Sequence, residues 1–267
     1  MKDYLTIKEF SKLSGIETTT LRYWDEIGLL SPARRDPRNN YRCYTPDQVI
    51  AANFITVMSS LGLPLKTIAE AEKERTPEFI MQMIERQEKV LDMEMSRLRE
   101  CYSVIHTRRE LINHGLSIDE SEISVKLLDD KEYILGPPNE FEEGQTFYEP
   151  FMDFCRKAKD LRINLNFPVG GYHASMESFL RKPGQPDRFL SIDPTGNSTR
   201  VAGEYLVGFT RNYYGRFSDL PERLAAYAQE NSLAWFGPVY VIYLHDETCI
   251  RDPEQYLVQV SVAVKSS

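Results

Sequence analysis

The stretch that most constrains the fold runs from Glu17 to Thr45 and reads ETTTLRYWDEIGLLSPARRDPRNNYRCYT. Apolar residues recur three apart at Leu21, Trp24 and Ile27, which predicts a short helix over residues 18–27 that the next glycine ends. These three side chains would lie on one face and point into a core. The first structural prediction is therefore a short amphipathic helix with a polar outer face.

A second short helix is predicted just upstream, over residues 6–14, with Ile7, Phe10 and Leu13 on its apolar face and Gly15 after it. Two short helices joined by a glycine turn form a helix-turn-helix, whose second helix has the size to enter the major groove of DNA. The side chains of that second helix that turn away from the core, toward such a groove, are Thr18, Thr19, Arg22 and Tyr23.

A basic hairpin is predicted directly after the second helix. Between Pro32 and Tyr44 there is one acid, Asp36, and there are four arginines: Arg34, Arg35, Arg38 and Arg42. An Asp-Pro pair and the Asn-Asn pair ending at Asn40 mark the turn. An isolated charged loop would simply be solvated, but cations on a rigid ribbon beside a groove-entering helix suit binding to DNA phosphates.

The string TLRYWDEIGLL, followed by NNYRCYT, resembles the MerR family of winged-helix transcription regulators over about the first quarter of the chain. The family more often has a tyrosine at Trp24, and we expect the larger ring to pack inward. The resemblance implies that the recognition helix and the hairpin, or wing, contact DNA and that a lysine after the wing reaches the DNA backbone. The expected DNA-binding residues are Thr18, Thr19, Arg22, Tyr23, Arg35, Arg38, Asn40, Tyr41, Arg42 and Lys66.

Two more helices are predicted behind the wing as its support. The first starts at Thr45-Pro46-Asp47, with Thr45 as the N-cap, and ends at Gly62. Its apolar stripe is expected to comprise Ile50, Phe54, Val57, Met58 and Leu61. Pro64 opens the second helix, which carries Leu65, Ile68 and Ala69.

A long helix is predicted from Thr76-Pro77 to about residue 115. Its apolar residues alternate between intervals of three and four, which is the heptad pattern of a coiled coil, with Gln87 in one seam position. The seam comprises Ile80, Ile84, Leu91, Met95, Leu98, Tyr102, Ile105 and Ile112. Such a helix cannot bury its seam alone, so we expect a homodimer, and MerR relatives use an antiparallel pair. The alternative is packing onto the chain's own C-terminal domain.

Composition and charge limit the class of protein. The net charge is −8, but residues 120–267 hold 15 basic and 22 acidic side chains, so most of the acidity lies away from the helix-turn-helix. The acidity of that part suggests a positively charged partner. No apolar run approaches the ~18 residues that cross a bilayer, and the N-terminus is no signal peptide, which predicts a cytoplasmic protein without membrane contact. The four cysteines lack metal-ligand spacing, so no metal and no cofactor are expected.

The last part of the chain contains two similar segments. EYILG at residues 132–136 corresponds to EYLVG at residues 204–208, and FYEPF at residues 147–151 corresponds to YYGRF at residues 213–217. A helix, over residues 152–160 or 220–230, and a strand pair follow in each copy. Two such strand-helix-strand-strand units would pair into one curved sheet with a cleft between them.

This repeat resembles the GyrI-like effector-binding domain, and the whole chain resembles the multidrug-sensing MerR regulators of the BmrR type. The expected fold class is multi-domain α+β. The expected organisation is a winged helix-turn-helix domain over residues 1–76, a coiled-coil dimerisation helix over residues 77–115, a linker over residues 116–122 and an effector-binding domain over residues 123–267.

Aromatic residues crowd the loops of the repeats, and aromatic faces attract flat or cationic organic ligands. The expected ligand-binding residues are Phe147, Tyr148, Tyr172, Tyr213, Tyr214, Tyr240, Tyr243 and Glu204. In the GyrI-like family a strand glutamate meets the ligand's positive charge, and that position is Val241 here. Either another acid replaces it, or the ligand is held mainly by aromatic stacking. The acids considered for that role are Glu140, Glu142, Glu143, Glu177 and Glu204.

The resemblance implies a dimeric transcription activator. It would bind a palindromic site in double-stranded promoter DNA and distort it so that RNA polymerase engages the promoter, in response to a lipophilic aromatic or cationic effector. A GyrI-like small-molecule hydrolase is the alternative, but no Ser-His-Asp or Cys-His constellation occurs, and no catalytic residue is expected. A third possibility is a repressor or architectural protein whose C-terminal domain binds another protein.

Overall fold

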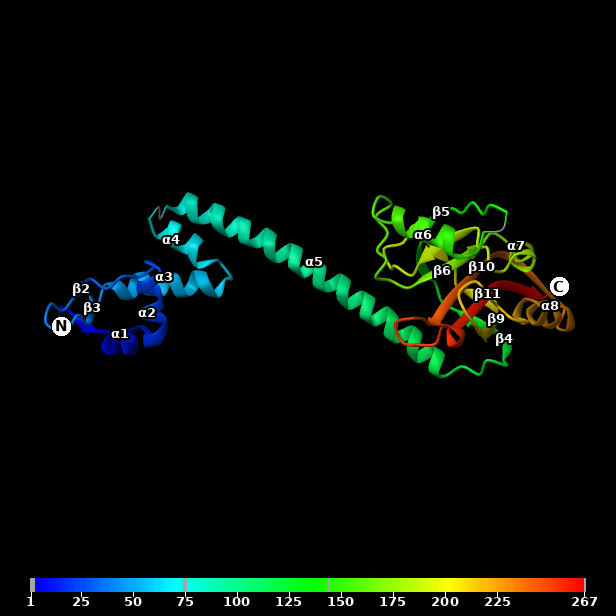
Figure 1. The fold of residues 1–267 in the computed structure, drawn as a ribbon, viewed down its shortest axis with the longest axis horizontal. Helices are drawn as coiled ribbons and strands as arrows, with labels where there is room; N and C mark the ends of the chain where they lie inside the picture. Colours follow the sequence, from blue (N-terminus) through cyan, green and yellow to red (C-terminus); the bar gives the residue numbers. More distant parts are fainter. Residues whose placement is uncertain (1–2, 74–75, 144, 267) are drawn as a thin grey trace. The chain divides into compact units, whose positions relative to one another are not determined.

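The computed structural model describes residues 3–73, 76–143 and 145–266 (Figure 1). The chain divides into two compact units, Met1–Arg99 and Glu100–Ser267. A single long helix, α5, contributes residues to both of them. In the described part of the chain, no helix is both long enough and apolar enough to span a bilayer.

The N-terminal unit is a helix-turn-helix with a three-stranded sheet of order β1-β3-β2. Its elements are β1 (Leu5–Thr6), α1 (Ile7–Ser14), α2 (Thr18–Glu26), β2 (Arg34–Arg35), β3 (Arg42–Tyr44), α3 (Gln48–Ser60) and α4 (Leu65–Lys73). Thr6 and Glu9 form a capping box, in which the Thr6 hydroxyl accepts from the Glu9 amide and the Glu9 carboxylate accepts from the Thr6 amide. Strands β2 and β3 are the two sides of the predicted wing.

The core of this unit joins the wing to both short helices. The Phe10 ring of α1 stacks on the Tyr44 ring of β3 with centroids 4.6 Å apart. Trp24 of α2 is buried, as its sequence position predicted. Leu13 and Ile27, however, are 57% and 43% exposed. The apolar residues three positions apart therefore predicted the helices correctly. The small core, however, covers less of each helix than this pattern indicated.

Helix α3 differs from its prediction in two respects. It begins at Gln48, and the Thr45 amide donates to the Gln48 side chain instead of Thr45 capping the helix. The buried residues are Ala52 and Ile55, whereas the predicted stripe residues Ile50, Val57 and Leu61 are 70%, 44% and 46% exposed. The helix is apolar on more than one side, so its sequence could not indicate which side faces the core.

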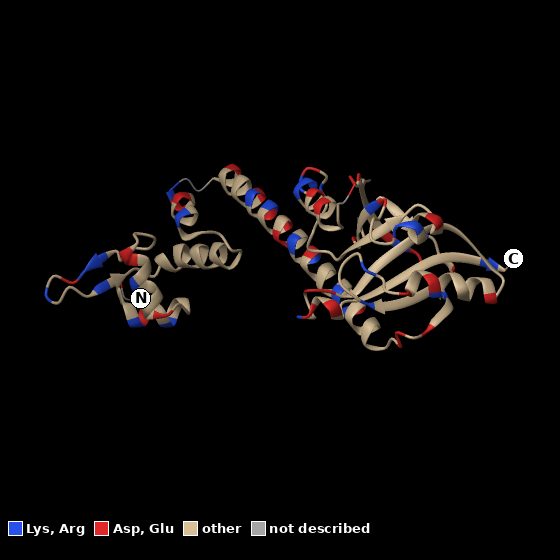
Figure 2. Ribbon diagram, turned by 45° about the vertical axis from the view of Figure 1, so that its right-hand side comes forward, with Lys and Arg blue, Asp and Glu red and all other residues tan. Residues whose placement is uncertain are grey.

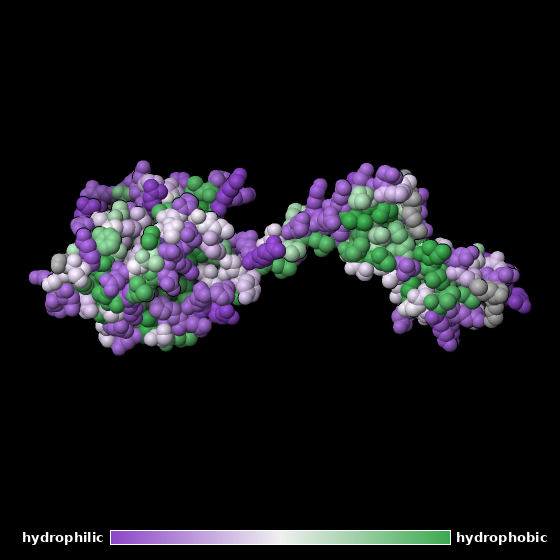
Figure 3. All heavy atoms as spheres, turned by 180° about the vertical axis from the view of Figure 1, so that it is seen from behind, coloured by the Kyte–Doolittle hydropathy of each residue, from purple (hydrophilic) through white to green (hydrophobic). Residues whose placement is uncertain are grey.

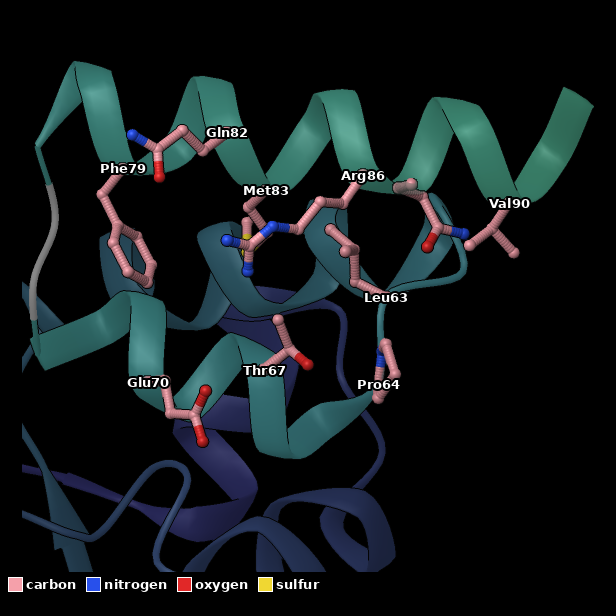
Figure 4. Close-up of a pocket in the computed structure, with 10 residues that line it drawn as sticks. Leu63, Pro64, Thr67, Glu70, Phe79, Gln82, Met83, Arg86 and Val90 are labelled. Carbon is pink, nitrogen blue, oxygen red and sulfur yellow. The ribbon is translucent and has the colours of Figure 1, made fainter.

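Helix α5 runs from Pro77 to Leu116. The Thr76 hydroxyl accepts from the Phe79 amide at its start. Phe79 and Met83 face α4 across a cavity of about 220 Å³ in the N-terminal unit (Figure 4). Gln87 leaves the predicted seam, because its side chain donates to the Leu61 carbonyl at the end of α3. The first turns of α5 thus belong to the core of the N-terminal unit.

The middle of α5 leaves an apolar stripe on the surface. Its members are Leu91, Met95, Leu98, Tyr102 and Ile105, which are between 48% and 70% exposed. Hydrophobic atoms, drawn in green, reach the molecular surface along this helix and over the N-terminal unit (Figure 3). We call these five residues the α5 stripe.

The last turns of α5 pack on the chain's own C-terminal sheet. The Ile112 carbonyl lies 3.1 Å from the His245 Nε2 atom, and His114 Nε2 lies 3.0 Å from the Gln259 side-chain oxygen. A Cβ atom at Gly115 would lie 2.5 Å from His245 Nε2, so a glycine is needed for this approach. The last turns of α5 therefore follow the alternative prediction, in which the helix packs onto the chain's own C-terminal domain.

The C-terminal unit is one eight-stranded antiparallel sheet of order β4-β9-β11-β10-β6-β7-β5-β8. The strands are β4 (Ile123–Leu128), β5 (Lys131–Pro138), β6 (Val169–His173), β7 (Arg188–Ser191), β8 (Ser198–Arg200), β9 (Gly203–Arg211), β10 (Leu233–His245) and β11 (Leu257–Ser266). The helices are α6 (Tyr148–Lys157), α7 (Met176–Arg181), α8 (Leu220–Glu230) and the short 3₁₀-helix η1 (Pro253–Gln255). Helix α6 begins four residues before the predicted start.

The two predicted repeats form the two halves of this sheet. The first half is β5-α6-β6-β7 and the second is β9-α8-β10-β11, and both place their strands in the same order outward from the centre. They meet where β6 and β10 pair antiparallel, with Tyr172 opposite Tyr240. This confirms the predicted strand-helix-strand-strand duplication and the α+β class of the domain.

The sheet has two covered faces. Val241 and Tyr243 belong to the core that includes Leu220 and Leu224 of α8, whereas Tyr240 and Ile242 face the opposite core. Leu111 of α5 packs against this second core. Alternation along β10 thus decides which aromatic residues lie near α7 and α8 and which lie near α5.

Candidate functional site

The wing is attached to the recognition helix α2 by a buried acid. The Asp25 carboxylate, whose side chain is 8% exposed, lies 2.6 Å from the Arg35 Nη2 atom and 2.6 Å from the Arg42 Nε atom. Because one carboxylate of α2 holds an arginine from each strand of the wing, the two elements are fixed relative to each other. A fixed geometry is what groove and phosphate contacts on one duplex require.

Most of the sequence-predicted DNA residues lie on the surface of this unit. Tyr23 and Tyr41 are 50% and 67% exposed, and the Arg38 side chain is 87% exposed beside Asp36. Arg22, Thr19, Asn40 and Lys66 are exposed as well, and Thr18 is partly exposed. Asn40 has a positive φ of 54° at the wing turn. Basic residues, drawn in blue, lie on the wing strands and its turn (Figure 2).

Two of the predicted residues have a structural partner as well. Arg35 and Arg42 pair with Asp25, so part of their charge is compensated and they position the wing. Sequence reasoning did not identify Asp25, because only the fold brings this acid of α2 beside arginines of both wing strands. It also left Arg34 out of the site, and the Arg34 guanidinium lies 3.9 Å from the centroid of the Tyr4 ring.

In the C-terminal unit, aromatic residues from three segments meet over β10. The Phe147 and Tyr214 rings are parallel within 4°, with centroids 5.8 Å apart, and Tyr214 contacts the Tyr243 ring at 4.4 Å. Tyr148 contacts Tyr213 at 5.6 Å. We call these five residues the aromatic cluster. Sequence reasoning predicted all five, because aromatic residues crowd the loops of the two repeats and Tyr243 lies on the strand after the second helix.

One side of the aromatic cluster lines a cavity of about 220 Å³, the outer cavity. Phe147, Phe151 and Tyr214 form its aromatic wall, and Asp246 and Glu247 lie at its polar side. The Tyr214 hydroxyl donates to the Glu247 carboxylate. Burial and this carboxylate raise the pKa of Tyr214 well above its ordinary value, so the phenol is protonated at neutral pH.

Helix α5 reaches the outer cavity through Arg108. The guanidinium donates to the Asp246 carboxylate at 3.3 Å, to the Thr248 hydroxyl at 3.1 Å and to the Asn166 carbonyl at 2.8 Å. Arg108 therefore ties α5 to two loops that border the cavity. Sequence reasoning identified neither Arg108 nor the acids Asp246 and Glu247, because they join the site only through the fold.

A second, inner cavity of about 10 Å³ adjoins the same cluster, with Phe147 and Tyr243 in its wall. His173 of β6 also lines it and is fully buried. Among the described residues, neither ring nitrogen of His173 has a partner in hydrogen-bond geometry. Burial lowers the pKa of His173 to about 4, against the smaller opposing effects of the Asp187 carboxylate and the Pro183 carbonyl.

Three predicted ligand residues do not join this site. Tyr172 and Tyr240 lie on the opposite face of the sheet, where the Tyr240 ring stacks on Tyr133 at 5.4 Å. The expectation that both line one cleft with Tyr243 is wrong, because strand alternation turns them away from it. Glu204 is exposed at the start of β9, at the end of that strand opposite to Tyr213 and Tyr214.

None of the acids considered as replacements for the missing glutamate lines the outer or the inner cavity. Glu177 instead accepts a hydrogen bond from the Trp235 indole, 3.2 Å away. Asp246 and Glu247 are the carboxylates beside the aromatic cluster, and each already has a hydrogen-bond donor. In the described residues, no group of three His, Cys, Asp or Glu side chains could hold a metal ion.

The winged helix-turn-helix with its basic wing defines the class of protein, which is a transcription regulator that binds DNA. Residues 5–74 match the family of MerR HTH family regulatory proteins. The chain is 25% identical over 271 residues to the multidrug-efflux transporter 2 regulator of Bacillus subtilis (strain 168), an alignment that covers 99% of this chain and 98% of that protein.

The multidrug-efflux transporter 1 regulator of the same strain is 24% identical over 280 residues, covering 98% of this chain and 99% of that protein. A solved structure of the EcmrR–DNA complex is 17% identical, with 98% of this chain and 100% of that chain aligned at a TM-score of 0.38. The chain is thus a MerR-family transcription regulator, related over its whole length to regulators of multidrug efflux.

The Asp25 contact gives a prediction with an unexpected sign. Replacing Asp25 by Asn removes a negative charge near DNA, which by electrostatics alone would strengthen binding. We expect D25N to weaken binding to promoter DNA by about tenfold instead, because Arg35 and Arg42 lose their shared anchor and the wing is no longer held. Titration of fluorescent promoter DNA measures this. The control is E26Q, which removes an exposed acid from the same helix, and stronger DNA binding by D25N would contradict the anchor.

The low pKa of His173 gives a pH prediction. The folded pKa of about 4 lies below the ordinary value of 6.5, so the unfolded chain binds the proton more tightly. The stability that neutral His173 provides is complete above pH 6.5 and falls as the pH drops toward 4. Between pH 7 and pH 5, His173 should cost the C-terminal unit about 2 kcal/mol of unfolding free energy.

Urea unfolding of wild type and of H173Q at both pH values measures this difference. The variant should lose less stability than wild type on going from pH 7 to pH 5. The control is H106Q, since His106 is a partly exposed histidine on α5. Equal pH dependence in wild type and H173Q would show that His173 is not held neutral.

Proposed function

We propose that this MerR-family regulator is a homodimeric transcription activator. It binds and distorts palindromic promoter DNA through two winged helix-turn-helix units, and an aromatic compound bound at the outer cavity controls that distortion. The observation that carries the proposal is the position of α5, which bears an exposed apolar stripe and also supplies Arg108 to the cavity.

The α5 stripe supports the dimer. Five large side chains about half exposed or more, at alternating intervals of three and four on one helix, are unfavourable in water. Burying each side chain against a partner helix would contribute roughly 1.5–3 kcal/mol. A second copy of the same helix offers a matching stripe, and a twofold dimer places two recognition helices for the two halves of a palindrome.

The wing geometry supports distortion of the DNA. Exposed Arg38 and Tyr41 lie at the wing, and Arg22 and Tyr23 lie on α2, so each unit contacts backbone and groove together. Two such units at a fixed separation would deform a promoter whose elements are spaced too far apart, at a cost of a few kcal/mol that the phosphate contacts offset. RNA polymerase would then engage both promoter elements.

The outer cavity supports the effector role. Its aromatic wall offers stacking surfaces, and the sequence relatives are regulators of multidrug-efflux transporters. Asp246 is paired with the Arg108 cation, whereas Glu247 accepts from the neutral Tyr214 phenol and keeps its charge, so the outer cavity suits aromatic compounds both with and without a positive charge. A compound that moves Asp246 would also move Arg108 and thereby α5, which links the effector to the DNA-binding unit.

An enzymatic role has little support. The relatives aligned over the whole chain are regulators, and the acids at the outer cavity already hold hydrogen bonds to Arg108 and Tyr214. A general acid or base needs a carboxyl group free to exchange a proton with the substrate. We therefore do not propose a hydrolase.

The dimer gives the first prediction. Replacing Leu91 and Leu98 by Asp places two charges in the proposed helix pair, and each uncompensated buried charge is strongly unfavourable. We expect a monomer with an unchanged circular dichroism spectrum and at least a hundredfold weaker binding to a two-half-site promoter. Sedimentation velocity and DNA titration measure this. M93D is the matched control, because Met93 is 65% exposed and lies on the other side of α5. A dimeric L91D/L98D variant would exclude the stripe as the interface.

The effector gives the second prediction. Thermal-shift screening of cationic and neutral aromatic compounds should find compounds that raise the melting temperature of the wild type, since a ligand that binds only the folded state stabilises it. These compounds should raise transcription from the bound promoter in vitro, and F147A should abolish both effects. If adding the protein lowers transcription, and none of the bound compounds changes the transcription level, the protein is a repressor instead.

A further inference from the structure

The inner and the outer cavity share Phe147 as a wall residue. Phe147 is only partly buried and directly precedes α6. On its other side stands Gly215, with a positive φ of 75°, where a Cβ atom would lie 2.9 Å from the Phe147 Cβ atom. Gly215 and Phe147, which approach each other this closely, both line the inner cavity.

His173 is the unusual group in the inner cavity. It is fully buried between the sheet and α7, where its ring packs edge-on against Phe179 with centroids 5.2 Å apart. A phenylalanine would satisfy that contact equally well, whereas two buried ring nitrogens call for hydrogen-bond partners. The Pro183 carbonyl lies near enough to act on the ring, but among the described residues no group meets full hydrogen-bond geometry with either nitrogen. The imidazole is neutral at pH 7, so it presents one donor and one acceptor.

No carboxylate lines the inner cavity. Val241 and Gly171, opposite each other on β10 and β6, form part of its wall. The Tyr243 hydroxyl accepts from the Gly215 amide at 3.0 Å, and in the described part of the chain no acceptor takes its own proton. The polar groups available to a ligand are therefore an uncharged imidazole and an uncharged phenol. The cavity wall has no carboxylate to offset the desolvation of a permanent cation, and the Asp187 carboxylate that acts on His173 already accepts from the Ala174 amide and the Ser178 hydroxyl.

We propose that His173 binds an uncharged hydrogen-bonding heteroatom of the effector, so that the effector class is a neutral heteroaromatic compound rather than a permanent organic cation. This inference rests on the proposed function, because it describes how the effector site selects its ligand. The aromatic body of the compound occupies the outer cavity and its polar edge displaces Phe147. His173, and secondarily Tyr243, then receive that edge.

Three compounds of nearly the same shape test this selection. Naphthalene has no heteroatom, quinoline has one uncharged ring nitrogen at pH 7, and N-methylquinolinium carries a fixed positive charge at that position. Isothermal titration of the full-length dimer at pH 7 should give quinoline an affinity at least tenfold higher than that of either other compound. A factor of ten is what one buried hydrogen bond provides.

Two variants assign the preference to His173. H173F keeps the ring packing and removes both nitrogens, so quinoline and naphthalene should bind it equally. H173Q restores a donor and an acceptor and should recover part of the preference for quinoline. H106F is the control, since His106 lies on the exposed part of α5. Because H173F could fail to fold, the ¹⁵N chemical shifts of the His173 ring in wild type, which should change on adding quinoline, provide an independent measurement.

The outcomes separate this inference from the proposed function. If N-methylquinolinium binds wild type as tightly as quinoline, or if H173F keeps the preference, His173 is a packing residue and the inference is wrong, while other screened compounds still support an effector site. If none of the three compounds binds but a larger cationic dye does, the inference also fails and the proposed function stands. If no aromatic compound binds and none affects transcription, both fail.

Discussion

The structure depends on one constraint, which is that a long helix must bury its apolar side although its own chain covers only its two ends. The first turns of α5 are buried in the N-terminal unit at Met83, and the last turns pack on the sheet beside His245. Between them the α5 stripe stays about half exposed or more. A second subunit is the natural cover, and the same helix that would form the dimer holds Arg108 at the outer cavity. In the proposed regulator, oligomerisation and ligand binding thus act on one element.

The C-terminal site combines an aromatic cluster with polar groups that are uncharged or hydrogen-bonded. Burial keeps the Tyr214 phenol protonated and the His173 imidazole neutral, while Arg108 compensates Asp246. The inner cavity therefore gains little from a cation and more from hydrogen bonds, whereas the outer cavity keeps the charge of Glu247 beside its stacking surfaces. Val241, at the position where the family resemblance leads us to expect an acid, fits this chemistry. The relation to multidrug-efflux regulators therefore leaves room for a different ligand chemistry in this chain.

Much of the fold could be predicted from sequence, because periodicity and turn residues are local signals. They identified α2, the wing and the strand-helix-strand-strand duplication. The side of α3 that faces the core could not be predicted, since that helix is apolar on several sides and only packing selects Ile55 over Ile50. Strand alternation separated Tyr172 from Tyr243, because one step in register reverses a side chain. Arg108 and His173 entered the site only through contacts between distant segments, which no local pattern encodes.

The central claim is that the effector site and the DNA-binding unit are coupled through α5, and thermodynamic linkage tests it most directly. The affinity of the dimer for the best compound from the thermal-shift screen is measured with and without promoter DNA, for wild type and for R108A. Coupling through Arg108 predicts that DNA changes this affinity by about fivefold or more in wild type and leaves it unchanged in R108A. An effector affinity that DNA does not alter in wild type would contradict the account.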